Sequence, residues 1–522
     1  MRAYIKKISV FCFALFASTL FSQELIPHEE TTPIKNGLIG ISSAVSGGWA
    51  VVASPQKDAG NRRGVGGVTF YQLTDGQWKV FQHVLPEDAS QLGNFGTSVA
   101  IDGTTAVISS IGDHQEKLFS GAVYVYNYDF LLGSWTQTIK LKASDLGMGK
   151  RYGQSVDIVG DLIVVGSYNA DGLAIKSGAG YVYKKVNNVW QEQQKLYTDV
   201  GESNDYFGHH VKILNENYIA VGAYNADGAK ERSGVVYVFK QTEEGWKQQA
   251  TLYDVEGESS DLFGYSLTFI PELPDATNTG RFPGILFVGA PGAQHENKKT
   301  GSVYLYTEEA SGWQLGLELI EPETDHNDHF GVSITANTKG GLFVGANRTN
   351  NDLDLNSGRV YYYQTLVGNG TSVSGGVHLS ENFIGAYNQF GTHVTSDEEN
   401  VIIGSPYADI NNITNSGGVN FFRISELVDD ESNLSGIYSL SQNVPNPSAS
   451  STVIQYELKK PGDVKISLFN INGQLISVLI DEYKNFGLYN LNVDSSKYAS
   501  GVYLYKFEVN DFTATKKMII GQ

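Results

Sequence analysis

The feature that most constrains the fold is an aromatic-Gly pair that recurs at nearly constant spacing along the chain. The copies are Phe95-Gly96, Tyr152-Gly153, Phe207-Gly208, Phe263-Gly264, Phe330-Gly331 and Phe390-Gly391, preceded by a degenerate copy at Ile39-Gly40. The glycines of successive pairs lie 55 to 67 residues apart. A fixed period of this length is typical of a repeat architecture in which each copy forms one structural unit.

Each copy contains the pattern of four short β-strands. In the copy that begins at Phe207 we expect strands at residues 208–214, 218–223, 234–239 and 246–253. The third of these alternates β-branched and aromatic residues with period 2, which is typical of a half-buried strand. The fourth strand is marked by a tryptophan in five copies: Trp78, Trp135, Trp190, Trp246 and Trp313.

Seven copies of four strands predict an all-β, seven-bladed β-propeller, because closing the sheets into a ring removes exposed sheet edges. The last copy ends soon after Phe422 without a tryptophan strand. We therefore expect residues 23–28 to supply the outer strand of the last blade. The sixth copy also lacks such a tryptophan, and the fifth carries an insertion over residues 271–283.

The repeats at residues 37–425 resemble FG-GAP repeats, the type that builds the propeller of integrin α-subunits. In that family an Asp-rich loop after the Phe-Gly strand binds calcium, which needs six or more oxygen ligands. Here the same position is mostly a tight turn, such as residues 101–104 and 215–217. Only the insertion of the fifth copy, with Asp275, Asn278 and Gly280, is long enough, and it lacks the alternating Asp pattern. We therefore do not expect the calcium sites of that family.

Acidic residues gather at two other places in the repeats. One set precedes the Phe-Gly pair: Asp199, Asp205, Asp254, Asp261, Asp325 and Asp328. The other lies between the second and third strands and includes Asp171, Asp227 and Asp409. Both sets should converge on one face as an acidic rim that binds a ligand or cation. The alternative, which the recurring Asn-Ala-Asp-Gly favours, is that the side chains bond their own backbone in Asx-turns. We predict no cofactor, with calcium at Asp171, Asp227 and Asp409 as the alternative.

The start of the chain predicts export. Three basic residues, Arg2, Lys6 and Lys7, precede an apolar stretch at residues 8–21, which together predict a signal peptide over residues 1–22. Cys12, the only cysteine, lies within it, so the exported protein has none for disulfides. No later segment reaches 18 consecutive apolar residues, so we expect no transmembrane segment. The net charge of −19 argues against nucleic acid as a partner.

The composition changes after Glu426, where an acidic linker at residues 427–436 ends the propeller at residues 23–426. Short alternating strands with turn signals follow over residues 437–522 and predict a small β-sandwich. Its motif residues are Pro445, Asn446, Pro447, Gly473, Gly501, Tyr503, Lys516 and Lys517. Their order and spacing resemble the C-terminal sorting domain of the type IX secretion system. The resemblance implies that this domain engages that machinery and directs passage across a Gram-negative outer membrane, giving a secreted or surface-attached protein.

The sequence contains no recognisable catalytic constellation: neither a Ser/His/Asp grouping, nor a nucleophile elbow, nor a pair of carboxylates suited to glycoside hydrolysis. We therefore predict a noncatalytic propeller that binds a protein or glycan, as an adhesion protein does, through its acidic loop face. The alternative is an exported polysaccharide-active enzyme with its site at the mouth of the propeller channel. Such an enzyme needs two or more titratable groups that converge there with perturbed pKa values.

Overall fold

The computed structural model describes residues 35–521, with short gaps at 272, 275–280, 283, 296–297, 322–324, 351–354, 366–372, 380–386, 426–437, 459–461, 471–473, 485–486 and 510–511. These residues divide into two compact units between Arg423 and Ile424. The predicted signal peptide, the strand predicted at residues 23–28 and the predicted linker at residues 427–436 lie outside the described residues. So do Asp275, Asn278, Gly280 and Gly473.

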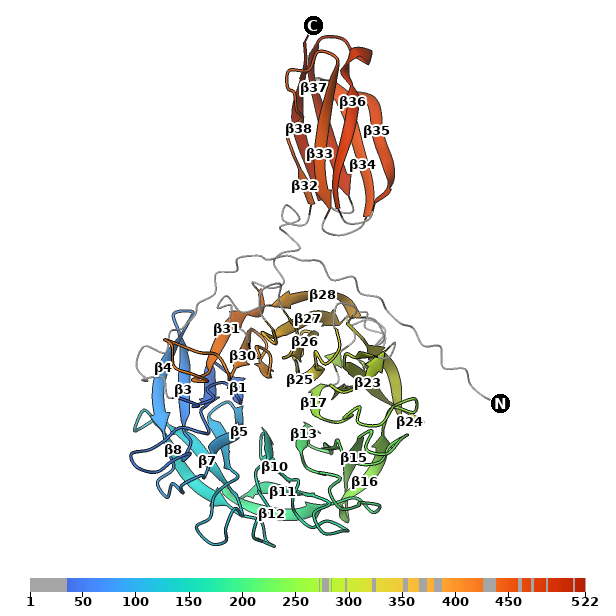
Figure 1. The fold of residues 1–522 in the computed structure, drawn as a ribbon. Coiled ribbons are helices and arrows are strands. Elements are labelled where there is room, and N and C mark those ends of the chain that lie inside the picture. The colour runs from blue at the N-terminus through green and yellow to red at the C-terminus, as the bar shows by residue number, and fades with distance from the viewer. Residues whose placement is uncertain are drawn as a thin grey trace, which may run out of the picture. The chain divides into compact units, whose positions relative to one another are not determined.

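The first unit is a ring of antiparallel sheets, each built from consecutive strands (Figure 1). The first two sheets are four-stranded and contain β1 (Ser43–Ser46), β2 (Trp49–Ala53), β3 (Val68–Thr74) and β4 (Gln77–Val84), then β5 (Phe95–Asp102), β6 (Thr105–Ser110), β7 (Ala122–Asp129) and β8 (Ser134–Leu141). The third and fourth contain β9 (Ser155–Val159), β10 (Leu162–Ser167), β11 (Ala179–Val186) and β12 (Val189–Leu196), then β13 (His210–Asn215), β14 (Tyr218–Ala223), β15 (Val235–Thr242) and β16 (Gly245–Leu252). The fifth and sixth contain β17 (Ser266–Ile270), β20 (Ile285–Ala290), β23 (Ser302–Glu309) and β24 (Gly312–Leu319), then β25 (Phe330–Ala336), β26 (Gly341–Ala346), β27 (Arg359–Thr365) and β28 (Val373–Leu379). A three-stranded sheet of β29 (His393–Ser396), β30 (Asn400–Ser405) and β31 (Gly418–Arg423) follows.

The described part of the chain thus holds seven successive blades, and the predicted all-β class is confirmed. The first strand of each blade lies at the centre of the ring and the fourth at its rim (Figure 1). The five tryptophans expected to mark fourth strands lie in β4, β8, β12, β16 and β24, and β28 has none, as predicted. The fifth blade also carries two small hairpins, β18 (Leu273–Pro274) with β19 (Arg281–Phe282) and β21 (Gln294–His295) with β22 (Lys298–Lys299).

The aromatic residue of each Phe-Gly pair anchors its blade. Phe95 is fully buried, and its ring lies 5.3 Å from that of Tyr124 in the third strand of the same blade. The same contact joins Phe207 to Tyr237 at 5.6 Å in the fourth blade. These rings interlock the inner and third strands, so the period-2 aromatic pattern of the third strands serves the core.

Each Phe-Gly pair also fastens its blade to the preceding one. The backbone N–H of the aromatic residue donates to a carbonyl just before the third strand of the previous blade, at 2.8 to 3.1 Å. The pairs are Phe95 to Val65, Tyr152 to Ser120, Phe207 to Ser177, Phe263 to Ser233, Phe330 to Thr300, Phe390 to Ser357 and Ile39 to Ser416. We call these contacts the blade joints. The joint of Ile39 links the first blade to the seventh, so the degenerate first copy closes the ring.

The blade joints share an unusual backbone. The residue before the pair has positive φ in all seven copies: Leu38, Asn94, Arg151, Tyr206, Leu262, His329 and Gln389. So does the residue two positions earlier: Asn36, Leu92, Gly149, Asn204, Ser260, Asn327 and Tyr387. This conformation is strained for residues other than glycine. Because it recurs at every joint, it belongs to the ring architecture and does not by itself mark a functional site.

The second unit is a β-sandwich, as predicted. One sheet contains β32 (Tyr438–Leu440), β33 (Ser451–Leu458) and β36 (Gly487–Asp494), and the other contains β34 (Gly462–Asn470), β35 (Leu475–Lys484), β37 (Gly501–Val509) and β38 (Phe512–Ile520). A 3₁₀ turn, η2 (Ser495–Lys497), links β36 to β37. Inward-facing residues of both sheets, such as Ile454 and Phe507, form one buried core.

Candidate binding surface

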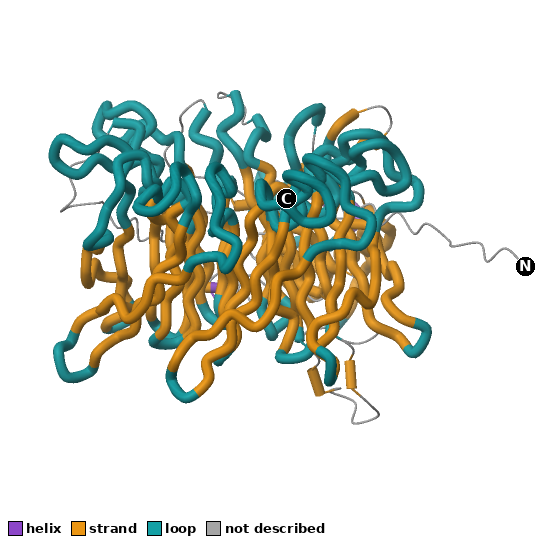
Figure 2. Tube along the Cα trace, turned by 90° about the horizontal axis from the view of Figure 1, so that it is seen from below, coloured by secondary structure: helices purple, strands orange, loops and turns teal. Residues whose placement is uncertain are grey.

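The two faces of the ring differ in the length of their connections. Long loops gather on one side of the strand layer, and short hairpin turns lie on the other (Figure 2). The long side, which we call the loop face, carries the blade-to-blade connections and the loops between second and third strands. Backbone bonds such as Asn204 N–H to Lys176 O at 2.9 Å join these two kinds of loop. The loops expected to share one face therefore lie side by side.

The three candidate cation ligands are each engaged within their own loop. Asp171 Oδ1 accepts the N–H of Lys176 at 2.9 Å, Asp227 Oδ1 that of Arg232 at 2.7 Å and Asp409 Oδ1 that of Asn415 at 2.8 Å. Asp171 also pairs with the Lys150 ammonium. Among the described residues, no group of three or more His, Cys, Asp or Glu side chains could hold a metal ion. The cation role of these residues stays a prediction.

The acidic residues that precede the Phe-Gly pairs are mostly buried in turns. Asp205, Asp261 and Asp328 are 8%, 4% and 3% exposed, and each accepts the N–H of the residue three positions earlier at 2.6 Å. Burial raises the pKa of Asp205 and of Asp261 to about 6. These carboxylates organise the connections and present little charge to solvent.

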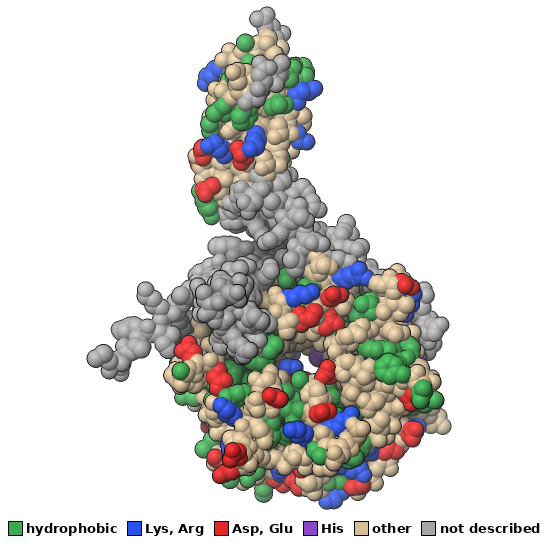
Figure 3. All heavy atoms as spheres, turned by 180° about the vertical axis from the view of Figure 1, so that it is seen from behind, with side chains coloured by type: hydrophobic (Ala, Val, Ile, Leu, Met, Phe, Trp, Pro, Cys, Tyr) green, Lys and Arg blue, Asp and Glu red, His purple; other side chains and the backbone are tan. Residues whose placement is uncertain are grey.

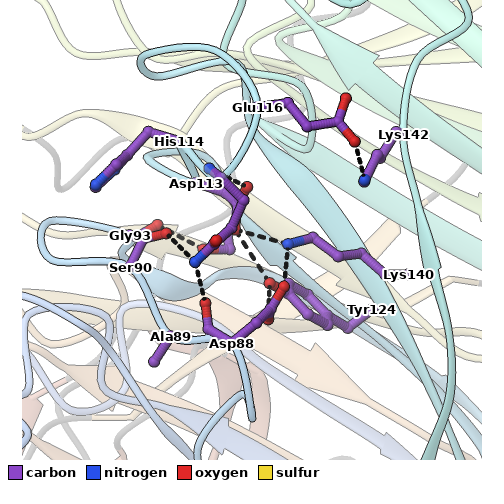
Figure 4. A network of polar contacts seen from close by, with 12 residues as sticks. Asp88, Ala89, Ser90, Gly93, Asp113, His114, Glu116, Tyr124, Lys140 and Lys142 are labelled. Atoms are coloured by element: carbon purple, nitrogen blue, oxygen red, sulfur yellow. Dashed lines mark hydrogen bonds and ion pairs between the residues drawn. The ribbon is translucent and has the colours of Figure 1, made fainter.

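Lysines neutralise other carboxylates on this side of the ring, as in the second blade (Figure 4). Lys140 Nζ lies 2.5 Å from Asp88 Oδ2 and 2.9 Å from Asp113 Oδ2. The Tyr124 hydroxyl donates to both carboxylates, at 2.7 and 3.1 Å. Lys195 binds Asp145 at 2.6 Å in the next blade. The loop face is therefore a mixture of charges, and its acidity is lower than the residue count suggests.

The most distinctive patch of the loop face is aromatic. Half-buried rings from the third, fourth and fifth blades form it: Tyr168, Tyr206, His209, Tyr224 and Tyr265. We call it the aromatic patch. His209 is central, with its ring 4.5 Å from that of Tyr224 and 4.9 Å from that of Tyr265. Tyr206 lies 5.3 Å from Tyr168 and 5.4 Å from Tyr224. His209 and Tyr265 directly follow a Phe-Gly pair, which places the patch beside the innermost strands.

The aromatic patch is polar at its edges. Tyr168 accepts a hydrogen bond from Arg151 at 3.0 Å. His209 Nδ1 is buried and has no hydrogen-bond partner among the described residues. Burial lowers the pKa of His209 to about 4 and raises that of Tyr224 to about 12, so both groups are neutral at pH 7. A neutral aromatic surface with hydroxyl groups is suited to bind amphipathic ligands.

Sequence reasoning missed the aromatic patch, although a signal was present. Tyr168 and Tyr224 occupy the same position in two copies of Tyr-Asn-Ala-Asp-Gly, where the motif draws attention to the aspartate and not to the tyrosine. The two remaining tyrosines flank Phe-Gly pairs, Tyr206 just before Phe207 and Tyr265 just after Gly264. The packing of three successive blades brings the four together.

The channel contains titratable groups. His210 and His393 begin the innermost strands β13 and β29, and a histidine lies in the central opening (Figure 3). Burial lowers the pKa of His393 to about 4 and that of His210 to about 3, the latter with help from the charges of His209, Lys212 and His393. Ser43 Oγ lies 3.2 Å from His393 Nδ1. The channel is thus not lined by Gly, Ser and apolar side chains alone.

In the second unit, the predicted motif residues fasten the last strand. Asn446, between Pro445 and Pro447, donates from Nδ2 to Lys517 O at 3.0 Å and accepts the N–H of Ile519 at 2.7 Å. Gly501 begins β37, and the Tyr503 hydroxyl donates to Ala499 O at 2.9 Å. Lys516 and Lys517 lie exposed on β38. These residues lock a terminal edge and leave two basic side chains free to contact solvent.

Family comparisons match both units. The model of the FG-GAP repeat matches residues 78–126, 135–183 and 190–239, and the model of the secretion system C-terminal sorting domain matches residues 444–521. Each matched repeat runs from the fourth strand of one blade to the third strand of the next. The chain carries FG-GAP repeats and a C-terminal sorting domain. The sorting domain marks this FG-GAP repeat protein for export by the type IX secretion system, to the cell surface or beyond.

Other comparisons are distant. A fungal alcohol oxidase in complex with copper is 11% identical, with 94% of this chain and 98% of that chain covered and a TM-score of 0.45. Sqt1 of Saccharomyces cerevisiae is 9% identical, with 93% and 96% covered and a TM-score of 0.41. PorZ, a surface component of the type IX secretion system of Porphyromonas gingivalis, is 10% identical, with 92% and 70% covered and a TM-score of 0.26. These values support no conclusion about function.

No curated protein sequence matches this chain. Across the described residues, no helix has the length and apolar character needed to cross a membrane.

Proposed function

We propose that this FG-GAP repeat protein is a noncatalytic binding protein, which holds an extracellular protein or glycan on its loop face. The observation that carries the proposal is the aromatic patch. Its tyrosines offer broad apolar area together with hydroxyl groups, and tyrosine is enriched among residues that dominate binding energy. They stand on loops held by a rigid ring, where binding residues concentrate. The mixed charges around the patch supply a polar rim.

A binding assay with matched variants tests this proposal. The exported chain is probed against extracellular matrix proteins and a glycan array, beside Tyr206→Ala/Tyr224→Ala and Tyr197→Ala. Tyr197 is 46% exposed and lies outside the aromatic patch. We expect the double variant to lose at least one ligand that the wild type and the single variant both bind. Absence of any ligand for the wild type, or a double variant that keeps every ligand of the wild type, would sink the proposal.

The alternative, an exported enzyme active on polysaccharide, is favoured by the histidines of the channel. Glycoside hydrolysis generally requires two free carboxylates, and the inner-strand carboxylates described here are engaged. Asp157 Oδ2 lies 3.0 Å from Lys212 Nζ and accepts the N–H of Ile213, and Asp102 accepts that of Gly160. Release of reducing ends from polysaccharides, abolished by His393→Ala, would support the enzyme in place of the binding protein.

A further inference from the structure

A small pocket opens between the fourth and fifth blades on the hairpin face, opposite the loop face. Its volume is 290 Å³, and it is lined by Leu214, Asn215, Tyr218, Phe269, Gly284, Glu308 and Trp313. The lining comes from the turn between β13 and β14, the turn between β23 and β24, and the facing ends of β17 and β20. Figure 3 shows this face, where acidic, basic and hydrophobic side chains are interspersed around the opening.

The pocket exists because Trp313 is packed differently from its equivalents. The tryptophans that mark the fourth strands of the other blades, Trp78, Trp135, Trp190 and Trp246, are 2% to 7% exposed, whereas Trp313 is only half-buried. A half-buried indole beside a tyrosine is an unusual arrangement for a repeat that buries this ring four times.

Neighbouring residues account for the difference. In β4 and β12, Gln82 and Gln194 clamp the backbone N–H and C=O of the next blade's tryptophan at 2.8 to 3.0 Å. In β8 the equivalent place holds Ile139, which packs in the same cluster as Trp190. In β16 it holds Ala250, which packs against the same cluster as Trp313 but is smaller than Ile139 and has no polar group to bond the tryptophan backbone. The boundary between the fourth and fifth blades therefore has a smaller side chain at this position than the three preceding boundaries.

The polar groups of the pocket converge on one carboxylate. Glu308 Oε1 accepts hydrogen bonds from the Tyr218 hydroxyl at 2.8 Å and from Gln249 Nε2 at 3.2 Å. Glu308 Oε2 has no partner among the described residues, so it remains available as an acceptor. The rings of Tyr218 and Trp313 stand 6.4 Å apart at 78°, forming two walls beside this oxygen.

Charge distinguishes between ligand classes. Aromatic rings with a carboxylate bind organic cations in many proteins. Here, however, Lys240 Nζ already lies 5.0 Å from the centre of the Tyr218 ring. Its positive charge offsets that of Glu308 and would repel a second cation at the same ring. A neutral ligand with hydroxyl donors and an apolar C–H face can pack against the two aromatic rings and donate a hydrogen bond to Glu308 Oε2.

We propose that the pocket lined by Tyr218, Glu308 and Trp313 binds one sugar unit of a neutral glycan. The ring of the sugar lies against the aromatic walls, and its hydroxyl groups donate to Glu308 Oε2 and bond the Asn215 amide. The volume is at the small end of ligand pockets, about 300 Å³ and above, which suits a single unit. This site is independent of the aromatic patch, which lies on the opposite face.

The test uses the full chain and an array of neutral oligosaccharides of glucose, galactose, mannose and N-acetylglucosamine. Glu308→Gln removes the charged acceptor with little change in shape, and we expect affinity to fall about tenfold or more. Glu309→Gln, one residue further along β23 and exposed, is the matched control and should bind as the wild type does. Trp313→Phe should weaken binding while it preserves an apolar wall.

Competition completes the test. Choline chloride, a quaternary cation, should not displace the saccharide, and Tyr206→Ala/Tyr224→Ala should still bind it. The proposal is overturned if no neutral saccharide binds, if Glu308→Gln matches the wild type, or if choline competes. Loss of saccharide binding in the tyrosine variant with retention in Glu308→Gln would move the glycan to the loop face and equally refute this site.

Discussion

Replacement of Lys140 by methionine should destabilise the second blade through the carboxylates that the lysine leaves behind (Figure 4). The Lys140 side chain is 13% exposed and pairs with Asp113, which is 4% exposed, and with Asp88, which is 40% exposed. Removing one partner of a buried ion pair costs about 3 to 5 kcal/mol. Because Asp88 reaches solvent, we expect the lower end, about 3 kcal/mol.

The assay is thermal unfolding with hydrogen exchange in β7 and β8. Unfolding entropy grows by about 2.1 cal/mol/K per residue, so in a ring of this size 3 kcal/mol lowers Tm by only about 4 °C. Exchange of β7 and β8 amides reports the same loss locally. Lys142→Met is the matched control, because its partner Glu116 is fully solvated and little change should follow.

A second variant tests the mechanism of that loss. Lys140→Met/Asp113→Asn neutralises the buried carboxylate and should recover part of the stability. Burial alone would raise the pKa of Asp88, but hydrogen bonds from Lys140 and Tyr124 hold it below its usual value of 3.8. The deficit of Lys140→Met should therefore shrink as the pH falls below that value. Equal effects of Lys140→Met and Lys142→Met, or no recovery in the double variant, would refute the reasoning.

Three further outcomes are expected. Burial raises the pKa of Asp205 and of Asp261 to about 6, so the stability they contribute is present below their unfolded pKa and is lost as the pH rises through 6. The Asp205→Asn/Asp261→Asn variant should therefore have a higher Tm than the wild type at pH 7, and this difference in Tm should close by pH 4. Gly417→Ala should lower the stability of the ring by about 2 to 4 kcal/mol, because φ is +78° and an added Cβ would lie 2.3 Å from Ile39 N, whereas Gly103→Ala, with open space around it, should lose about 1 to 2 kcal/mol in the same melt. Deletion of residues 437–522 should leave the propeller inside the outer membrane, as measured by cell fractionation, and normal export would contradict the role of the sorting domain.

The sequence predicted the blades well because their signals are local. Trp135 and Trp246 mark outer strands. The alternation from Val235 to Phe239 marks a third strand, because side chains of a strand point alternately to its two faces and the residue pattern follows that period. The degenerate copy at Ile39-Gly40 is also visible in the sequence, because its glycine keeps the spacing of the other copies, but the sequence assigned ring closure to residues 23–28 and not to this joint.

The binding surfaces could not be predicted in the same way. Leu38 and Tyr206 adopt positive φ, a conformation that sequence patterns assign to Gly and Asn. The backbone conformation of the blade joints could therefore not be predicted from the sequence. The pocket beside Trp313 depends on Ala250, a residue in another blade with no chemistry of its own. Such a site arises where a neighbouring blade has a smaller side chain than its equivalents, and the sequence of a single repeat does not show which residues of the next blade it will face.

The closing joint has a consequence for the order of folding. Every other joint connects neighbouring blades, but this one brings together segments 379 residues apart, as the contact between Asn36 and Asn415 shows. Contacts of such separation form late. Until they form, the apolar faces of the first and seventh blades, which pack together in the closed ring, stay exposed and promote aggregation. An exported chain therefore completes its ring only when both segments have reached the same side of the membrane.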